Sequence, residues 1–420
     1  MIQVDILPHN DKINDGDVFE INTKNVSYFS HSFFKYPAKF IPQIPNWAIK
    51  NFTEEEDYVL DCFMGSGTTL LESTLLNRIP LGVDFDKLSV LLTKVKCTPL
   101  SELQIAVVLN FCASLDYDER HDFDLPNFKN IGSWFSKETI KKLNYLYDKI
   151  SNSNLDSASK DFLFICFVSI VRKTSFSDEQ SPKPYVSKKH PKTPLDPADI
   201  FSKFSKIAKN YLFKFEDDYS IHEPPQFIGN DAKSFTCKKY LSKIDLVCCS
   251  PPYINAFDYV RVLSLENIWL RNLDDNSIIS HKMKQIGTEQ IYSKDYNKFP
   301  LEIGIKELDN VIQRIFELDK KRAHVVLLYF LQMKETIINI YKHLKKGGYF
   351  VLVVGNSVIR GVEVNASKYL GDLSKKEGFH HLKTFSYLIK TPYLRIPRKS
   401  NGGLIKYDRV IVLKKDDTKK

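Results

Sequence analysis

One stretch, DYVLDCFMGSGTTLLESTLLNRIPLGVDFDK (residues 57–87), constrains the fold of this chain more than any other. Tyr58–Leu60 is a short apolar strand, Gly65–Gly67 is a tight turn, and a helix with one apolar face begins at Thr68. A second apolar strand, Pro80–Val83, then ends on Asp84. Strand, glycine turn, helix and strand in this order form a βαβ unit, which predicts an α/β fold with a parallel sheet.

Three further strands extend this sheet. A buried strand is predicted at residues 244–249, another at 349–354 and a last one at 410–413. The strand at 349–354 is expected to follow a helix that ends at Lys345–Lys346 and is capped by Gly347–Gly348. The intervening residues are polar and helical, which divides the chain into 1–100, a helical insertion at 101–225, and 226–420 with a second polar insertion at 271–323.

The composition is that of a globular protein with a basic excess. Of the 420 residues, 43% are hydrophobic and 26% are charged, and 60 Lys and Arg against 51 Asp and Glu give a net charge of +9. This charge is compatible with a polyanionic partner. The longest apolar run, 162–171, is shorter than a membrane span and is interpreted as a core helix. The N-terminus lacks a signal-peptide pattern, and the seven cysteines include no CxxC pair, so we expect a cytoplasmic protein with neither disulfides nor a zinc site.

The glycine turn has the features of a ligand site. Gly65 and Gly67 let the backbone approach a ligand at the start of a helix, where free N–H groups favour polar or anionic groups. Asp84 lies 17 residues after Gly67, close to the spacing at which a carboxylate binds ribose hydroxyls in this topology. The third glycine of a dinucleotide motif is absent, so the site suits a nucleoside cofactor without a pyrophosphate. The alternative is a purely structural turn.

A rigid tetrapeptide, Ser250-Pro251-Pro252-Tyr253, ends the predicted strand at 244–249. Two prolines stop both helix and sheet, so the loop is held stiffly. The Ser250 hydroxyl and the Pro251 carbonyl can accept hydrogen bonds from an amino group, and Tyr253 offers a flat face to a base. Ligands bind outside the carboxyl ends of parallel strands, so we expect this loop to face the glycine turn.

Five segments in a coherent order resemble one known family, the AdoMet-dependent DNA amino-methyltransferases, which modify N4 of cytosine or N6 of adenine. The segments are DCFMGSGTT, SPPY, HSFFKYPAKFIPQIPNWAI (residues 31–49), GNDAKSF and HLKKGGYFVLVVGNS. The similarity covers residues 31–97 and about 226–413. It implies a Rossmann-like class I methyltransferase sheet with a large helical insertion between the cofactor half and the catalytic half. It also implies AdoMet as cofactor, double-stranded DNA as partner, no metal, and protection of DNA from a separate restriction endonuclease.

The resemblance carries functional roles onto matching positions of this chain. The methionine part of AdoMet is expected beside Phe40, Asp61, Phe63, Gly65 and Gly67, with Thr68 completing the set. The resemblance assigns the ribose hydroxyls to Asp84 and the adenine amino group to Asp231. The target base is assigned to Ser250, Pro251, Pro252 and Tyr253. Cys62 departs from the pattern, because family members often have proline there; this removes rigidity but no contacting group.

The implied mechanism is direct displacement on a flipped base, with no covalent intermediate. The base stacks against Tyr253 while its amino nitrogen is aligned by acceptors on Ser250 and Pro251. Serine at the first motif position favours N4 of cytosine, and N6 of adenine stays open. A nucleophilic role for Cys248 or Cys249, as in C5-cytosine methylation, is disfavoured because the typical Pro-Cys dipeptide is missing. Adjacent cysteines also point to opposite faces of a strand.

The expected DNA contacts lie in a basic, irregular stretch and beside the active loop. The candidates are Arg172, Lys173, Lys188, Lys189 and Arg261. A merely solvated charged loop is the alternative, and residues 271–323 compete as the sequence reader. Two other functions stay open: an RNA amino-methyltransferase, and a DNA-binding module that keeps the fold without catalysis.

Overall fold

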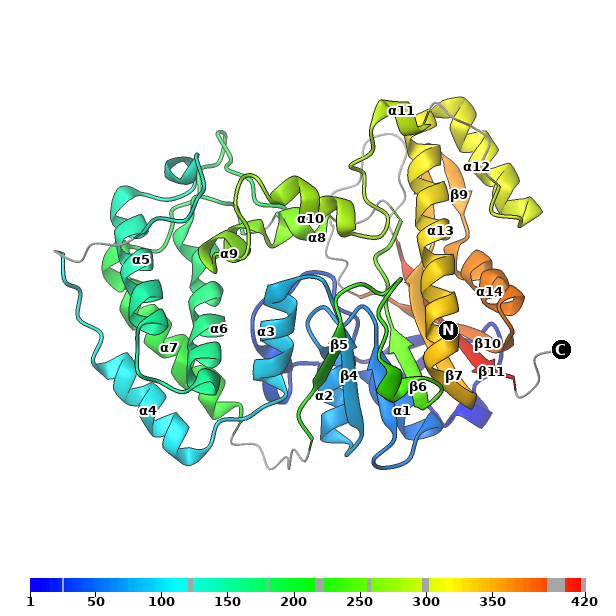
Figure 1. Cartoon of the computed structure of the whole chain (residues 1–420), viewed down its shortest axis with the longest axis horizontal. Helices are drawn as coiled ribbons and strands as arrows, with labels where there is room; N and C mark the ends of the chain where they lie inside the picture. Colours follow the sequence, from blue (N-terminus) through cyan, green and yellow to red (C-terminus); the bar gives the residue numbers. More distant parts are fainter. Residues whose placement is uncertain are drawn as a thin grey trace.

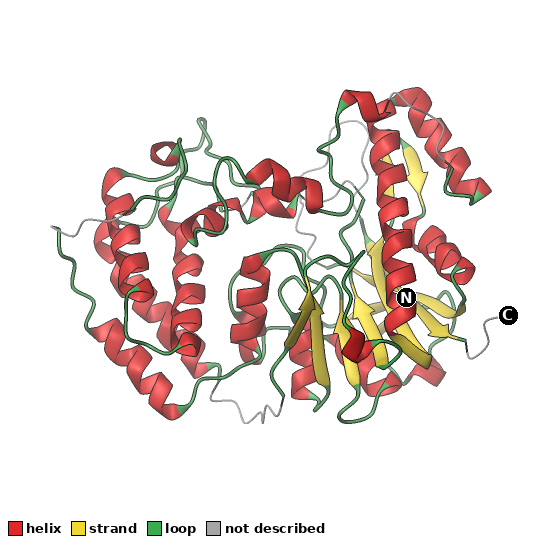
Figure 2. Ribbon diagram, in the orientation of Figure 1, coloured by secondary structure: helices red, strands yellow, loops and turns green. Residues whose placement is uncertain are grey.

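A computed structural model describes residues 1–24, 26–119, 124–179, 181–215, 223–254, 258–296, 302–390 and 405–416. Figure 1 shows a sheet with helices on both faces and a separate group of helices beside it, at the left of the view. Figure 2 shows that strands are confined to the sheet side of the molecule, whereas the group at the left is helical.

In the described part of the chain, the central sheet has nine strands in the order β1-β2-β10-β11-β7-β6-β3-β4-β5. β11 is antiparallel to both of its neighbours, and the remaining neighbours are parallel. From β5 to β7 the order is that of a Rossmann sheet, 3-2-1-4-5. The prediction of a Rossmann-like class I methyltransferase sheet is therefore confirmed. The strand bounds are β1 Ile2–Val4, β2 Val18–Ile21, β3 Tyr58–Asp61, β4 Ile79–Val83, β5 Gln226–Gly229, β6 Ile244–Cys249, β7 Leu344–Gly355, β10 Phe379–Leu388 and β11 Tyr407–Lys415.

The strand order reverses between β3 and β6, which pair directly through Val59 with Leu246 and Leu60 with Val247. From β3 the chain continues to β4 on one side, whereas β6 is followed in the sheet by β7 on the other side. The connections that leave β3 and β6 therefore diverge, and this point of an open α/β sheet is where a ligand crevice forms. The glycine turn and the Ser250–Tyr253 loop both begin there.

Alternating strand residues bury both faces of the sheet. Val59, Leu246 and Cys248 share an apolar cluster with α1 (Gln43–Phe52), whereas Leu60 and Cys249 share another with α13 (Lys320–His343) and α14 (Ala366–Lys376). α2 (Thr68–Leu75) connects β3 to β4, and α3 (Lys87–Lys96) follows β4. The two cysteines point to opposite faces, as the period of a strand requires.

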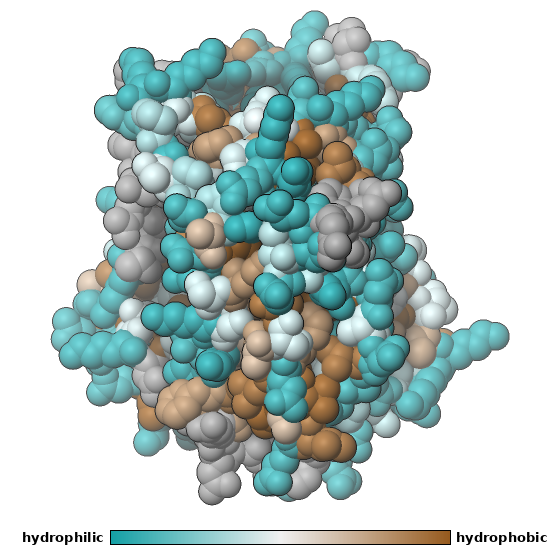
Figure 3. Space-filling view, turned by 90° about the vertical axis from the view of Figure 1, so that its left-hand side faces the viewer, coloured by the Kyte–Doolittle hydropathy of each residue, from teal (hydrophilic) through white to brown (hydrophobic). Residues whose placement is uncertain are grey.

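The helices between α3 and β5 form a lobe that shares one apolar cluster with α3 and α9 (Ser264–Trp269). They are α4 Glu102–Ala113, α5 Lys137–Ser151, α6 Ser157–Thr174 and α7 Ile200–Phe213. The apolar run at 162–171 lies within α6 and is mostly buried, as predicted for a core helix. Figure 3 faces this lobe and shows hydrophilic side chains over its upper half and apolar ones gathered lower, where Figure 1 places α4. None of the helices described here is both long and apolar enough to cross a membrane.

The segment between the active loop and α13, which includes the second polar insertion, contributes short helices near the carboxyl ends of the strands. α8 (Tyr259–Val262) and α10 (Ile278–Lys284) contact each other, and α11 (Ser293–Tyr296) and α12 (Lys306–Leu318) pack against α13. A two-stranded sheet of β8 (Ser357–Ile359) and β9 (Val362–Val364) follows β7.

The expected helix end at Lys345–Lys346 is wrong, because α13 already ends at His343 and β7 begins at Leu344. The pairing between β6 and β7 jumps from Ile244–Leu344 to Leu246–Tyr349, so the residues between them form a bulge. Gly347 has a φ of 71° there. The glycines thus serve an irregular strand rather than a helix cap.

Candidate active site

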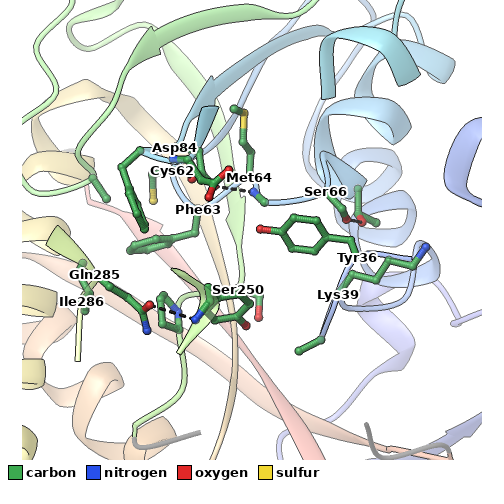
Figure 4. A pocket seen from close by; sticks show the side chains of 18 of the residues that line it. Tyr36, Lys39, Cys62, Phe63, Met64, Ser66, Asp84, Ser250, Gln285 and Ile286 are labelled. Carbon is green, nitrogen blue, oxygen red and sulfur yellow. Dashed lines mark hydrogen bonds between the residues drawn. The ribbon is translucent and has the colours of Figure 1, made fainter. Parts of the chain in front are cut away.

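A cavity of about 270 Å³ lies at the point where the strand order reverses. Segments from well-separated parts of the chain form its wall (Figure 4). In that view Tyr36 and Lys39 face the cavity from the side opposite Gln285 and Ile286. The lining residues are Tyr36, Ala38, Lys39, Phe40, Cys62, Phe63, Met64, Gly65, Ser66, Thr68, Asp84, Phe85, Asp86, Asn230, Asp231, Ala232, Ser250, Pro252, Tyr259, Lys284, Gln285 and Ile286.

The glycine turn after β3 forms one wall of this cavity. Gly65 lines the cavity, and both glycines have a positive φ, 47° at Gly65 and 72° at Gly67. The Gly67 N–H closes the turn by donating to the Met64 carbonyl at 2.7 Å. A Cβ on Gly67 would lie 2.5 Å from the Thr93 Oγ1 atom, so glycine also allows α3 to pack against the turn. Asp61 lies behind the turn, fully buried, and its Oδ1 accepts the Phe63 N–H at 2.9 Å.

The Asp84 carboxylate holds the glycine turn against the end of β4. Its Oδ2 accepts the Gly65 N–H at 2.8 Å, and its Oδ1 accepts the Asp86 N–H at 2.9 Å. Burial, together with the neighbouring Asp86 carboxylate, raises the pKa of Asp84 to about 7. Two oxygens with two lone pairs each leave acceptor capacity toward the cavity after these two bonds.

The N-terminal segment that covers the cavity is fastened to α2 through Glu72, which is 1% exposed. The Glu72 carboxylate accepts from His31 Nε2 at 2.6 Å and from Asn46 Nδ2 at 2.7 Å. Burial lowers the pKa of His31 to about 4, so the imidazole is a neutral donor in this contact. Lys39 in turn donates to the His31 carbonyl at 2.6 Å, which places Lys39 and Phe40 at the cavity.

The loop after β6 presents only part of the tetrapeptide to the cavity. Ser250 and Pro252 line it, whereas Tyr253 is turned toward the sheet, and its hydroxyl donates to Asp408 Oδ1 at 2.7 Å. Cys248 and Cys249 are completely buried, and burial raises the pKa of both thiols well above the ordinary value. Both are therefore neutral at physiological pH, which agrees with the argument against a cysteine nucleophile.

The cavity brings together most of the residues expected at the cofactor and the base. Those that line it are Phe40, Phe63, Gly65, Thr68, Asp84, Asp231, Ser250 and Pro252, whereas Asp61, Gly67, Pro251 and Tyr253 lie outside its lining. Aromatic faces beside carboxylate acceptors are the groups that a nucleoside requires. The lining offers both kinds of group, carboxylates at Asp84 and Asp231 and aromatic rings at Phe63 and Phe85, so its chemistry fits a nucleoside cofactor such as AdoMet.

Several lining residues were not predicted from the sequence. Phe85 and Asp86 directly follow Asp84, so the end of β4 was the available signal for them. Tyr259 follows the active loop, the tripeptide 284–286 comes from the second polar insertion, and Gln285 accepts the Tyr259 N–H at 3.1 Å. No local pattern reveals that this insertion folds back onto the cavity.

The expected DNA contacts divide into internal and exposed side chains. The Arg172 Nε lies 3.4 Å from Glu266 Oε1, and its guanidinium also donates to the carbonyls of Val262 and Pro182. Arg172 therefore joins α6 to α8 and α9 and is half-buried, so its role as a phosphate contact stays a prediction. Lys173 is half-buried, whereas Lys188, Lys189 and Arg261 are exposed.

Comparisons with known proteins find methyltransferases similar in sequence to this chain. A family model described as DNA methylase matches residues 5–94. The type II methyltransferase M.MvaI of Kocuria varians is 24% identical over 93% of this chain and 90% of its own length. The type II methyltransferase M.BsoBI of Geobacillus stearothermophilus is 25% identical over 63% of this chain and 58% of its own length. A SAM-dependent methyltransferase structure from Methanosarcina mazei aligns over 88% of this chain and 96% of that chain, with 11% identity and a TM-score of 0.33.

Proposed function

Because this chain belongs to the family of AdoMet-dependent DNA amino-methyltransferases, we propose that it methylates an exocyclic amino group of a base in double-stranded DNA, with N4 of cytosine as the target. It is a type II DNA methyltransferase of the family that includes both N4-cytosine and N6-adenine enzymes, and AdoMet is its cofactor.

One observation carries the proposal. The glycine turn after β3 and the Ser250–Tyr253 loop after β6 open onto the same cavity, so a nucleoside cofactor and a second planar ligand can meet there. Asp84, Asp231 and Phe85 are the residues that we assign to the nucleoside. Tyr36, Lys39 and Phe40 are assigned to its polar tail, because the segment that carries them covers the opposite side.

The chemistry that we propose is positioning rather than covalent catalysis. AdoMet, when bound, supplies an electrophilic methyl group. The Ser250 hydroxyl, which lines the cavity, accepts a hydrogen bond from the amino group of the flipped base and keeps its lone pair directed at the methyl carbon. The Pro251 carbonyl is the second acceptor in this proposal. The resemblance assigns the aromatic face for the base to Tyr253, although its ring lies outside the cavity lining with its hydroxyl on Asp408. The neutral, buried Cys248 and Cys249 have no part in the reaction.

Serine at the first position of the tetrapeptide supports cytosine over adenine, because serine there resembles N4-cytosine enzymes and Asp or Asn is the more usual adenine pattern. N6 of adenine is the second candidate, since the same acceptors suit either amino group. An RNA amino-methyltransferase and a catalytically silent DNA-binding module are the other outcomes that the experiment below distinguishes.

The proposed DNA surface lies on the side of the molecule at which the parallel strands end. The connection between α6 and α7 lies on this side of the helical lobe (Figure 1), and it carries the exposed Lys188 and Lys189. Arg261 follows the active loop and is also exposed. We propose that these cations contact phosphates and that the enzyme protects DNA in the cytoplasm from a separate endonuclease of the same specificity.

The test is to incubate the protein with unmodified DNA and isotopically labelled AdoMet, digest the DNA to nucleosides and separate them by mass spectrometry. We expect label in N4-methyldeoxycytidine. Label in N6-methyldeoxyadenosine would keep the reaction and refute the base assignment. Label only with an RNA substrate would support the RNA enzyme, and AdoMet binding without transfer to either would support the silent module.

Two serine variants connect the product to the site. Ser250→Ala should lower the transfer rate by about 10- to 100-fold while AdoMet still binds, because the acceptor for the base is removed. Ser153→Ala is the matched control and should leave the rate unchanged, because Ser153 is a half-buried serine after α5 whose hydroxyl donates to the Ile150 carbonyl, away from the cavity. A Ser250→Ala protein as fast as the wild type would refute the proposed mechanism.

A further inference from the structure

Three neighbouring strands place one row of residues beneath the active loop. In the sheet register, Gly355 of β7 pairs with Asp408 of β11, and Asp408 pairs with Tyr387 of β10. Directly paired residues point to the same face of a sheet. Gly355, Asp408 and Tyr387 therefore form a row across β7, β11 and β10 on one face of the sheet, the face that the Tyr253 side chain contacts.

Gly355 provides the space for this turn. A Cβ on Gly355 would lie 2.9 Å from the Tyr253 Cε2 atom and 2.7 Å from the Ile405 Cγ2 atom, closer than carbon atoms pack. The missing side chain lets the Tyr253 ring lie against β7 and reach the next strand. Any other residue at position 355 would displace the ring.

Asp408 receives the Tyr253 hydroxyl at the end of this path. Its Oδ1 accepts from Tyr253 at 2.7 Å, and its Oδ2 accepts from the Tyr387 hydroxyl at 2.8 Å. The carboxylate is 7% exposed, and burial raises its pKa while the two hydroxyl donors lower it. Burial and the Asp408 carboxylate raise the pKa of Tyr253 well above its ordinary value, so its hydroxyl stays protonated, and the Ser250 hydroxyl hydrogen-bonds to it from the other side. A chain of contacts thus connects Ser250, at the cavity, with strand β10.

We propose that Asp408 is a positioning residue for methyl transfer: it holds the Tyr253 hydroxyl so that the Ser250–Tyr253 loop is already set when DNA arrives, and Tyr387 orients Asp408. This inference rests on the proposed function. Two prolines stiffen the backbone of the loop, but they leave the Tyr253 side chain free to rotate. A hydrogen bond to a buried carboxylate removes that freedom before the base binds. Binding of the base then costs no further conformational entropy of the Tyr253 side chain.

A double-mutant cycle tests whether Asp408 acts through Tyr253. Asparagine at 408 has the same size but only one acceptor oxygen, and phenylalanine at 253 keeps the ring and removes the hydroxyl. We expect Asp408→Asn and Tyr253→Phe each to lower kcat by about 10- to 100-fold, with the Kd of AdoMet unchanged within about twofold. The double variant should be no slower than the slower single variant, because both changes break one contact. Multiplied effects, or an unchanged kcat in Asp408→Asn, would refute the inference.

A matched control separates positioning from general stability. Tyr240 is a tyrosine with 2% exposure whose hydroxyl donates to Gln226 beside β5, away from the row. Tyr240→Phe loses a comparable hydrogen bond, and it should leave kcat within about twofold of the wild type. A drop in kcat equal to that of Asp408→Asn would show that any lost tyrosine contact slows the enzyme, which would overturn the assignment.

A second measurement needs no turnover, so it distinguishes failure of this inference from failure of the proposed function. Amide hydrogen exchange, followed by mass spectrometry on the protein without DNA, reports how firmly the peptide that carries Tyr253 is held. We expect several-fold faster exchange of this peptide in Asp408→Asn and Tyr253→Phe, and wild-type exchange in Tyr240→Phe. Equal exchange in all four proteins would refute the positioning role even if the wild type showed no methyl transfer on any substrate.

Discussion

Replacing Asp84 with asparagine tests the ribose-binding role that we assign to this carboxylate. Its two oxygens already accept the N–H groups of Gly65 and Asp86, which leaves two further acceptor sites for the ribose hydroxyls. Asparagine keeps one oxygen and turns an NH₂ group toward one of the two backbone donors. Hydrogen bonds to a charged group contribute about 1.5–3 kcal/mol each. Losing one such bond and weakening the second costs about 3 kcal/mol, equivalent to about a 100-fold rise in the Kd of AdoMet.

Titration calorimetry at pH 8 measures this change directly, with Asp372→Asn as the matched control. Asp372 lies in α14, where its carboxylate pairs with Lys375 on the surface, so its replacement should leave the Kd of AdoMet unchanged. Thermal melting of each variant shows whether the glycine turn is still formed. An Asp84→Asn protein that melts like the wild type and binds AdoMet within about threefold of it would refute the ribose assignment.

Three other predictions concern pH, the glycine turn and the DNA surface. Because burial raises the pKa of Asp84 to about 7, this carboxyl becomes protonated as the pH falls from 8 to 6, and calorimetry should show AdoMet affinity decreasing over that range by up to about 10-fold; a flat profile would contradict it. Gly67→Ala should lower stability by about 1–3 kcal/mol in thermal melts, since its φ is 72° and a Cβ would lie 2.5 Å from a side-chain atom. Gly132→Ala, where nothing lies within 4 Å of the added Cβ, is its control. Replacing both Lys188 and Lys189 with alanine should reduce the slope of log K against log salt by about 2 in DNA-binding titrations, and an unchanged slope would remove them from the surface.

Short stretches of sequence were sufficient to predict the parts of the site that each depend on one local segment. The βαβ unit at 57–87 carries its own strands, its glycine turn and Asp84, and these residues interact with one another across fewer than 30 positions. Proline and glycine also act on their own backbone, so the Ser250–Tyr253 loop could be identified as the rigid end of a strand. The error at Lys345–Lys346 arose because a glycine pair fits a bulged strand as well as a helix cap.

Only the tertiary structure decided which distant side chains meet. Tyr253 and Asp408 are 155 positions apart, and their contact depends on β11 lying next to β7, with glycine at the crossing. The sequence placed Arg172 in a basic stretch, but it could not show that the buried Glu266, 94 positions away, lies 3.4 Å from the Arg172 guanidinium. Local sequence patterns reflect the backbone conformation that each residue favours. The partner of a charge or a hydroxyl depends instead on strand order and register, because packing of the whole sheet determines both.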